Sequence, residues 1–266
     1  MFSKIQFFLS KLSLLKNPLF TFVYTSLFFF KNAKLGVSFY NEEAVISAIR
    51  SGKSIIRMGD GDMVNIQLGW KNGYHYDSPR LRQMYREIIA SYSKTSPYIL
   101  GVPIFINESN ESLRHRGPGK LNWGLRMKAM FLLTFSRTET YMDAHSFYYD
   151  NYFERVIYPC IADKKIIFIT RKETINSQKE KNTLPWKDMA FIETPSLDAL
   201  VEYKRIKDDI DSALKNVNPK DVVLLCGMGP VGKYLVYEYA RHGYQGLDIG
   251  KVIEVMFTGE SIAWYI

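Results

Sequence analysis

Short apolar runs alternate with amphipathic stretches along most of the chain, and this alternation is typical of an α/β fold. The apolar runs predict buried strands over 54–58, 98–102, 139–143, 165–170, 190–193, 221–226 and 244–249. Apolar positions at helical spacing predict helices over 39–52, 77–94, 123–135, 152–162, 197–217 and 233–242. We therefore expect a Rossmann-like, open and mostly parallel sheet with helices on both faces.

Two polar segments are predicted to be loops. Residues 107–124 carry four basic side chains, which either clamp a diphosphate or are simply solvated: Arg114, His115, Arg116 and Lys120. Residues 171–182 follow a predicted strand, at the carboxyl edge where open α/β sheets bind ligands. Arg171 is therefore a candidate for binding a phosphate-containing ligand.

Residues 1–36 form a basic and apolar leader, and we expect one further domain over 37–266. The leader has five lysines and no acid, and residues 18–30 are 13 uncharged residues rich in Phe and Leu. A membrane span takes roughly 20 apolar residues, and no small-residue cleavage site follows. We expect an interfacial helix on a membrane surface. A spanning helix, or a helix that packs on its own domain or on a second subunit, remains open.

Composition narrows the class of protein. The chain has 266 residues, 47% of them hydrophobic, which suffices for a sizeable core. Most of the net charge of +8 lies in the leader, which argues against a nucleic-acid binder with a basic face on its folded domain. The two cysteines, Cys160 and Cys226, are too few for a disulfide framework. We expect a cytoplasmic protein, peripheral at the cytoplasmic face of the membrane.

The most informative motif follows the strand predicted at 54–58. Gly59 and Gly61 predict a turn that holds Asp60 and Asp62 two residues apart. Carboxylate oxygens are ligands that Mg²⁺ and Mn²⁺ prefer, and these ions also coordinate substrate phosphates. Arg57, just upstream, pairs with a phosphate or locks one of the aspartates. A plain solvated turn is the alternative.

A second motif, G-x-G-x-x-G over 227–232, lies between a predicted strand and a predicted helix. Gly227 and Gly229 would let backbone N–H groups meet a pyrophosphate, and Asp248 follows about 20 residues on. Pro230 removes one of these donors. The motif fits a dinucleotide, S-adenosylmethionine, or only a tight turn between a strand and a helix.

Four stretches together resemble the GT-D type glycosyltransferases, bacterial enzymes that use nucleotide-sugar donors. They are 56–62 (IRMGDGD), 141–147 (YMDAHSF), 194–199 (TPSLDA), and Gly229-Pro230 with 243–250 (GYQGLDIG). The resemblance extends from about Phe39 to Trp264. It implies a Rossmann-like fold, a divalent metal at Asp60 and Asp62, and a nucleoside-diphosphate sugar donor, with UDP-sugars first.

The chain departs from the family pattern in three places. Met58 replaces an aromatic residue, Asp62 replaces a glutamate, and Lys251 stands where a histidine usually follows Asp-Ile-Gly. The shorter Asp62 keeps a ligand but shifts the metal. The absence of the histidine bears on donor or acceptor choice.

The resulting hypothesis is metal-assisted glycosyl transfer. Asp60 and Asp62 hold Mn²⁺ or Mg²⁺, which offsets charge on the leaving UDP. The glycine loop, with Arg57 or Arg171, orients the donor, and Asp143 and Asp248 are candidate general bases. The acceptor is a glycan or lipid-linked glycan of surface polysaccharide, lipopolysaccharide or glycoprotein synthesis, and a homo-oligomer is possible.

Two other classes of protein stay open at this point. The first is a methyltransferase or NAD-dependent oxidoreductase that uses the glycine loop, and it leaves Gly-Asp-Gly-Asp unexplained. The second is a non-catalytic, membrane-associated subunit of a glycan-assembly complex, in which Asp60 could be replaced without effect.

Overall fold

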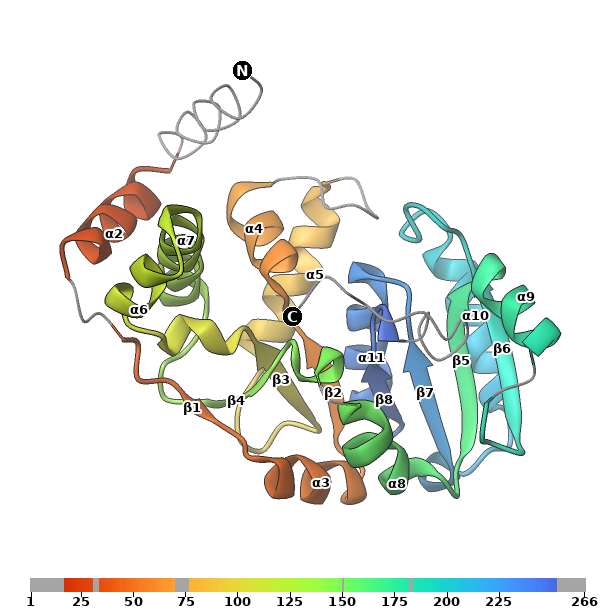
Figure 1. Cartoon of the computed structure of the whole chain (residues 1–266). Helices are drawn as coiled ribbons and strands as arrows, with labels where there is room; N and C mark the ends of the chain where they lie inside the picture. Colours follow the sequence, from red (N-terminus) through yellow and green to blue (C-terminus); the bar gives the residue numbers. More distant parts are fainter. Residues whose placement is uncertain (1–16, 31–33, 70–76, 150, 182–183, 253–266) are drawn as a thin grey trace.

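Eight parallel strands form one sheet at the centre of the molecule (Figure 1). The computed structural model describes residues 17–30, 34–69, 77–149, 151–181 and 184–252. In spatial order the strands are β1 (Ser38–Phe39), β4 (Thr140–Asp143), β3 (Tyr98–Val102), β2 (Ser54–Arg57), β8 (Gln245–Asp248), β7 (Val222–Cys226), β5 (Lys165–Arg171) and β6 (Met189–Thr194). The predicted fold class, an open parallel sheet with helices on both faces, is confirmed.

Helices cover both faces of the sheet. The described helices are α2 (Pro18–Phe29), α3 (Glu42–Arg50), α4 (Asp60–Leu68), α5 (Pro79–Ala90), α6 (Asn110–His115), α7 (Pro118–Thr134), α8 (Tyr158–Ile161), α9 (Lys172–Lys181), α10 (Tyr203–Leu214) and α11 (Pro230–Arg241). One apolar cluster joins the sheet to α5, α7, α10 and α11, and a second joins the opposite face to α3 and α8.

The strands divide their side chains between these two clusters because successive residues of a strand point to opposite faces. In β7, Val222 and Leu224 belong to the first cluster, whereas Val223 and Leu225 belong to the second. Every residue of β7 is buried, as the uninterrupted apolar run predicted.

Both predicted loops are wrong, because each contains a helix. Residues 107–124 hold α6 and the start of α7, separated by Gly117, whose φ is 111°. Leu113, Leu121 and Leu125 bury their side chains between the two helices, so the apolar spacing outweighs the polar composition. Residues 172–181 form α9, a polar helix whose first turns bury Thr174 and Ile175.

The predicted turn at Gly59–Asp62 is also wrong in its local structure. Helix α4 begins at Asp60, so both aspartates lie in its first turn. Carboxylates are favoured there because the amide N–H groups at the start of a helix are unpaired and the helix dipole is positive.

The order of the strands places a topological switch point at the carboxyl edge of the sheet. From β5 the chain leads to its neighbour β6, whereas from the adjacent β7 it leads through α11 to β8, on the other side. The carboxyl ends of β5 and β7 therefore border a topological switch point, which is the usual ligand site of an open α/β sheet.

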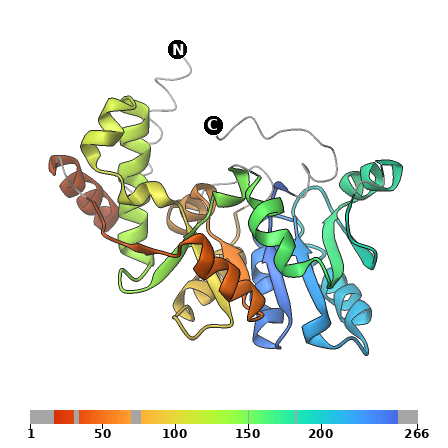
Figure 2. The same cartoon turned by 60° about the horizontal axis from the view of Figure 1, so that its bottom comes forward.

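Helices α2, α6 and α7 form a lobe beyond the β1 edge of the sheet, as both views show (Figures 1 and 2). Helix α2 packs on α7 and buries Phe20. In the described part of the chain, no helix combines the length and apolar character needed to cross a bilayer.

Candidate active site

The two aspartates in the first turn of α4 lie in different surroundings. Asp60 is half-buried, and its Oδ1 accepts a hydrogen bond from the next backbone N–H, that of Gly61 (2.8 Å). Asp62 points inward and its Oδ2 accepts the N–H of Gly59 (2.9 Å), which fixes the start of the helix. Asp62 therefore fixes the start of α4, whereas the hydrogen bond of Asp60 is local to its own turn.

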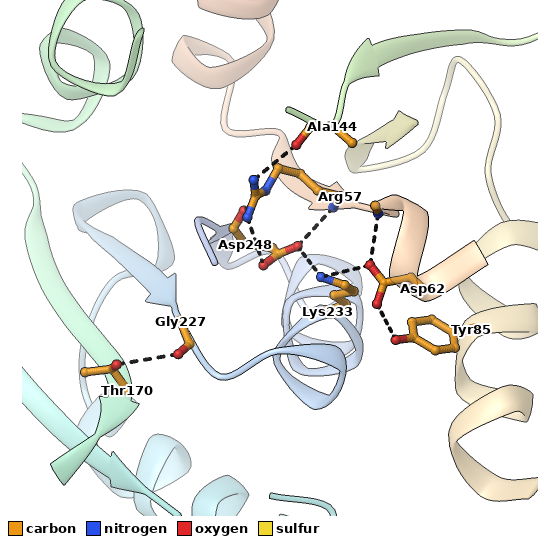
Figure 3. A network of polar contacts seen from close by, with 9 residues as sticks. Arg57, Asp62, Tyr85, Ala144, Thr170, Gly227, Lys233 and Asp248 are labelled. Carbon is orange, nitrogen blue, oxygen red and sulfur yellow. Dashed lines mark hydrogen bonds and ion pairs between the residues drawn. The ribbon is translucent and has the colours of Figure 1, made fainter. Parts of the chain in front are cut away.

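Two further side chains bind the Asp62 carboxylate from other helices (Figure 3). The Tyr85 hydroxyl of α5 donates to Oδ1 at 2.5 Å. The Lys233 ammonium of α11 lies 3.5 Å from Oδ2. Burial raises the pKa of Tyr85 well above its usual value and the Asp62 charge adds to the shift, so the phenol stays a donor.

Asp248, at the end of β8, is the most deeply buried acid of this group, with 1% of its surface exposed. Its Oδ2 accepts hydrogen bonds from Lys233 Nζ (2.9 Å) and from the backbone N–H of Arg57 (3.2 Å). Oδ1 lies 3.8 Å from Nη2 of Arg57. Asp248 therefore ties α11 and β2 together at the carboxyl edge of the sheet.

Arg57 is built into the same network. Its Nε donates to the backbone oxygen of Asp248 (2.7 Å), and its Nη1 donates to that of Ala144 (3.1 Å). The guanidinium lies 4.9 Å from the ring centre of Phe147 and 5.2 Å from that of Tyr148. Arg57 therefore holds Asp248, rather than Asp60 or Asp62 as the locking role considered from the sequence would have it.

The backbone next to Asp248 leaves room for this arginine only because residue 250 is glycine. Gly250 has φ of 52°, and a Cβ at this position would overlap the Arg57 guanidinium. Steric exclusion by Arg57 therefore explains why the third residue of Asp-Ile-Gly, Gly250, is a glycine.

The buried network contains two cations, Arg57 and Lys233, and two anions, Asp62 and Asp248. Burial lowers the pKa of Lys233, but the carboxylates of Asp248 and Asp62 outweigh this, so its pKa is raised and the amine stays charged. The four charges cancel, and the neighbouring Asp60 adds a negative charge to this part of the site.

Asp143 and His145 lie at the end of β4, near these acids. Asp143 Oδ1 accepts the backbone N–H groups of Ile104 (3.2 Å) and His145 (3.1 Å). The His145 ring stacks on Phe105, with Nδ1 3.8 Å from Asp143 Oδ1. Burial lowers the pKa of His145, although Asp143 and Asp60 oppose the shift, so the imidazole is neutral at pH 7.

The glycine loop borders the switch point, opposite Arg171 at the end of β5. Its Gly227 N–H already donates to Ile169 O (2.9 Å), and its carbonyl faces the Thr170 hydroxyl at 3.5 Å (Figure 3). Gly229 has φ of 69°, and Pro230 is the first residue of α11. The loop therefore starts a helix as predicted, although one of its amide donors is used within the sheet.

Most of these residues directly follow a predicted strand, so the sequence already predicted that they lie at the carboxyl edge of the sheet. It did not name Tyr85 or Lys233 as site residues. A signal for Lys233 existed, since it directly follows the G-x-G-x-x-G motif on a helix whose neighbouring positions are apolar. Within the described ranges, no group of three or more His, Cys, Asp or Glu side chains could hold a metal ion by itself.

The acids and the glycine loop lie at the carboxyl edge of a parallel sheet, and comparison with known proteins identifies the family. The model of the glycosyltransferase GT-D fold family matches residues 55–256. The chain therefore belongs to the GT-D fold glycosyltransferases, and it is a glycosyltransferase. No curated protein matches the chain.

Solved structures share the fold. A glycosyltransferase with domain of unknown function 1792 from Streptococcus sanguinis is 21% identical, with a TM-score of 0.67 over 85% of this chain and 86% of that one. A selenomethionine-substituted structure of domain 1792 gives 16% identity and a TM-score of 0.68, over 93% of this chain and 88% of that one. A third structure, described as domain 1792 with a distinct glycosyltransferase fold, is 17% identical. Its TM-score is 0.66 over 87% of this chain and 86% of that one.

Proposed function

We propose that the protein transfers a sugar from a nucleoside-diphosphate sugar, with UDP-sugars as the first donors to test, to a hydroxyl of a bacterial surface glycan, lipid-linked glycan or glycoprotein. The observation that carries this proposal is the Asp60 carboxylate. It lies at the carboxyl edge of the sheet beside a neutral buried network, and among the described residues its one hydrogen bond is local.

The oxygen atoms present suit Mn²⁺ or Mg²⁺. Asp60 would be the first ligand, and Asp62 Oδ1 keeps one acceptor position after accepting from Tyr85. Hard cations of this kind take carboxylate oxygens and complete their coordination with water and substrate phosphates, so few protein ligands are needed. When bound, such a cation offsets the negative charge that develops on the leaving diphosphate.

The donor diphosphate would lie at the switch point. Arg171 supplies a guanidinium at the end of β5, and the start of α11 supplies backbone N–H groups and the positive end of the helix dipole. The loop at Gly229 allows close approach of the diphosphate. Together these groups would hold the donor while the sugar is transferred.

We assign the general base to Asp143 and a positioning role to Asp248. The Asp143 side chain is 14% exposed, and two backbone N–H groups fix its orientation, so it could meet an acceptor hydroxyl. Asp248 is buried and paired with Lys233 and Arg57. The same pairing argues against a dinucleotide enzyme, because there the corresponding acid must be free to bind a ribose.

The test compares Asp60→Asn with Asp163→Asn, an exposed aspartate in the turn after α8, in the full chain. We expect Asp60→Asn to lower metal-dependent release of UDP from a UDP-sugar panel by at least about 100-fold. Thermal melting should show a Mn²⁺-dependent rise with UDP for the wild type and for Asp163→Asn but not for Asp60→Asn. Full activity in Asp60→Asn would overturn the metal assignment.

A further inference from the structure

The outer face of α2 is apolar and exposed to solvent. Of the nine large apolar side chains that are exposed in the described part of the chain, five lie on this helix or at its end: Leu19, Phe22, Phe28, Phe29 and Phe30. Phe22 is 70% exposed and Phe29 is 75% exposed. A cluster of this kind on one helix marks an interaction surface rather than the scattered apolar residues of an ordinary surface.

The inner face of α2 is fixed to the lobe. Phe20 is completely buried, and the Tyr24 hydroxyl donates to Asn122 Oδ1 of α7 at 2.6 Å. Asn17 caps the start of the helix through the N–H of Phe20. These contacts hold the helix in one orientation, so the phenylalanines of the other face stay directed outward.

The end of α2 is held as firmly. Asn110 Nδ2 donates to the backbone oxygens of Leu27 (2.7 Å) and Phe30 (2.6 Å). The buried Lys128 ammonium in turn donates to Asn110 Oδ1 (2.8 Å). The carbonyls that a helix end normally leaves to water are therefore satisfied from the protein side.

Basic side chains lie beside this face. Residues 1–41 contain five lysines and no acid, and of these lysines only Lys34 lies in the described ranges. In residues 112–138, Arg126 and Lys128 are buried and Arg116 is paired with Glu108. Arg114 lies 5.8 Å from the Phe28 ring centre, and Lys120 at the start of α7 is exposed. Cations beside exposed aromatic residues match the headgroup region of an anionic bilayer.

We propose that the outer face of α2, with its basic surroundings, docks the protein in the plane of an anionic lipid bilayer without crossing it. Helix α2 has 12 residues, which is too short to span. A second copy is a poorer occupant, because a symmetric interface would bring the like charges of Arg114 and Lys120 together. The docking does not depend on the transfer reaction.

Docking through α2 would also fix the position of the candidate active site relative to the membrane surface. Helix α7 contacts α2 on one side and α4, which begins at Asp60, on another. One helix layer therefore separates the proposed lipid-binding face from the helix that carries Asp60.

The test is co-sedimentation of the full chain with phosphatidylcholine vesicles, with and without phosphatidylglycerol. We compare wild type, Phe22→Glu/Phe29→Glu, and the matched control Leu197→Glu/Val201→Glu, which changes two exposed apolar residues elsewhere on the surface. The wild type and the control should bind the anionic vesicles, and less so at high salt. Partitioning of the α2 variant should fall at least about tenfold.

Three outcomes would overturn the proposal. The wild type could fail to bind anionic vesicles, or the α2 variant could bind them as well as the wild type. Light scattering could also reveal a wild-type dimer that the α2 variant splits, with no vesicle binding by either, and a second copy would then be the occupant. UDP binding is measured on the same samples, so a failure of docking and a failure of the proposed transferase are distinguishable.

Discussion

Two buried lysines, one in the site and one in the lobe, have different partners, and their pKa values shift in opposite directions. Lys233 lies between the carboxylates of Asp62 and Asp248. Lys128 donates to the backbone oxygen of Glu108 (2.6 Å) and to the amide oxygen of Asn110. Burial lowers the pKa of both, but the two carboxylates reverse the shift for Lys233, whereas the pKa of Lys128 falls to about 8.

The difference shows what each lysine does. In the site, the positive charges of Lys233 and Arg57 together balance two anions, so the amine of Lys233 and its charge are both needed. In the lobe, Lys128 acts through its hydrogen bonds to neutral oxygens, which join α6 to α7 and, through Asn110, to α2. The site therefore depends on charge balance, and the lobe depends on hydrogen-bond geometry.

The strongest way to break this comparison is to remove the charge of Lys233. We expect Lys233→Met to lower the free energy of unfolding by about 3–5 kcal/mol, because the two buried carboxylates of Asp62 and Asp248 are then balanced by one cation, Arg57. Urea unfolding followed by circular dichroism at pH 7 measures the change. A loss below about 1 kcal/mol would mean that water or a conformational change compensates these carboxylates.

Removing the other lysine should cost less. We expect Lys128→Met to lower the free energy of unfolding by about 1–3 kcal/mol, since two buried oxygens lose their donor but no opposite charge is left behind. Lys120→Met, on the exposed side of the same helix, is the control and should change stability by less than about 0.5 kcal/mol. A loss for Lys128→Met as large as that for Lys233→Met would contradict the distinction.

The smallest expected effect is on the pH dependence of the free energy of unfolding, to which the two lysines contribute with opposite signs. Between the folded pKa of Lys128, about 8, and its unfolded value, the unfolded chain binds more protons, so this group makes stability rise with pH. The pKa of Lys233 is raised, so its stabilisation is complete below the unfolded value and is lost only as pH rises through the folded value.

The measurement compares each Lys→Met variant with the wild type at pH 8 and at pH 10. The stability of the wild type relative to Lys128→Met should grow by on the order of 1–2 kcal/mol over this interval. Its stability relative to Lys233→Met should not grow. A parallel increase for both variants would show that the two ammonium groups share one environment.

Seven of the eight strands were predictable because each is encoded by a local apolar run. Strand β1 was missed because it has only two residues, and Phe39 was assigned to the helix predicted over 39–52. The placement of Asp60, Asp143, Arg171 and Asp248 at one edge follows from the parallel order of the sheet. Helices α6 and α9 were missed because their polar residues and the glycine–proline break at Gly117 resemble a loop. The network was missed for another reason. The contacts of Lys233 with Asp62 and Asp248 depend on packing between elements that are distant in the sequence.

The central position of β2 also has a consequence for how the protein is made. Strand β2 pairs with β3, which follows soon in the chain, and with β8, so that Arg57 and Asp248 meet across 191 residues of sequence. Contacts over such long separations form late and slowly. During synthesis the half around β2, β3 and β4 can collapse early, but the catalytic edge cannot be assembled until β8 has left the ribosome. A chain cut before β8 would lack Asp248 and with it the contacts to Arg57 and Lys233.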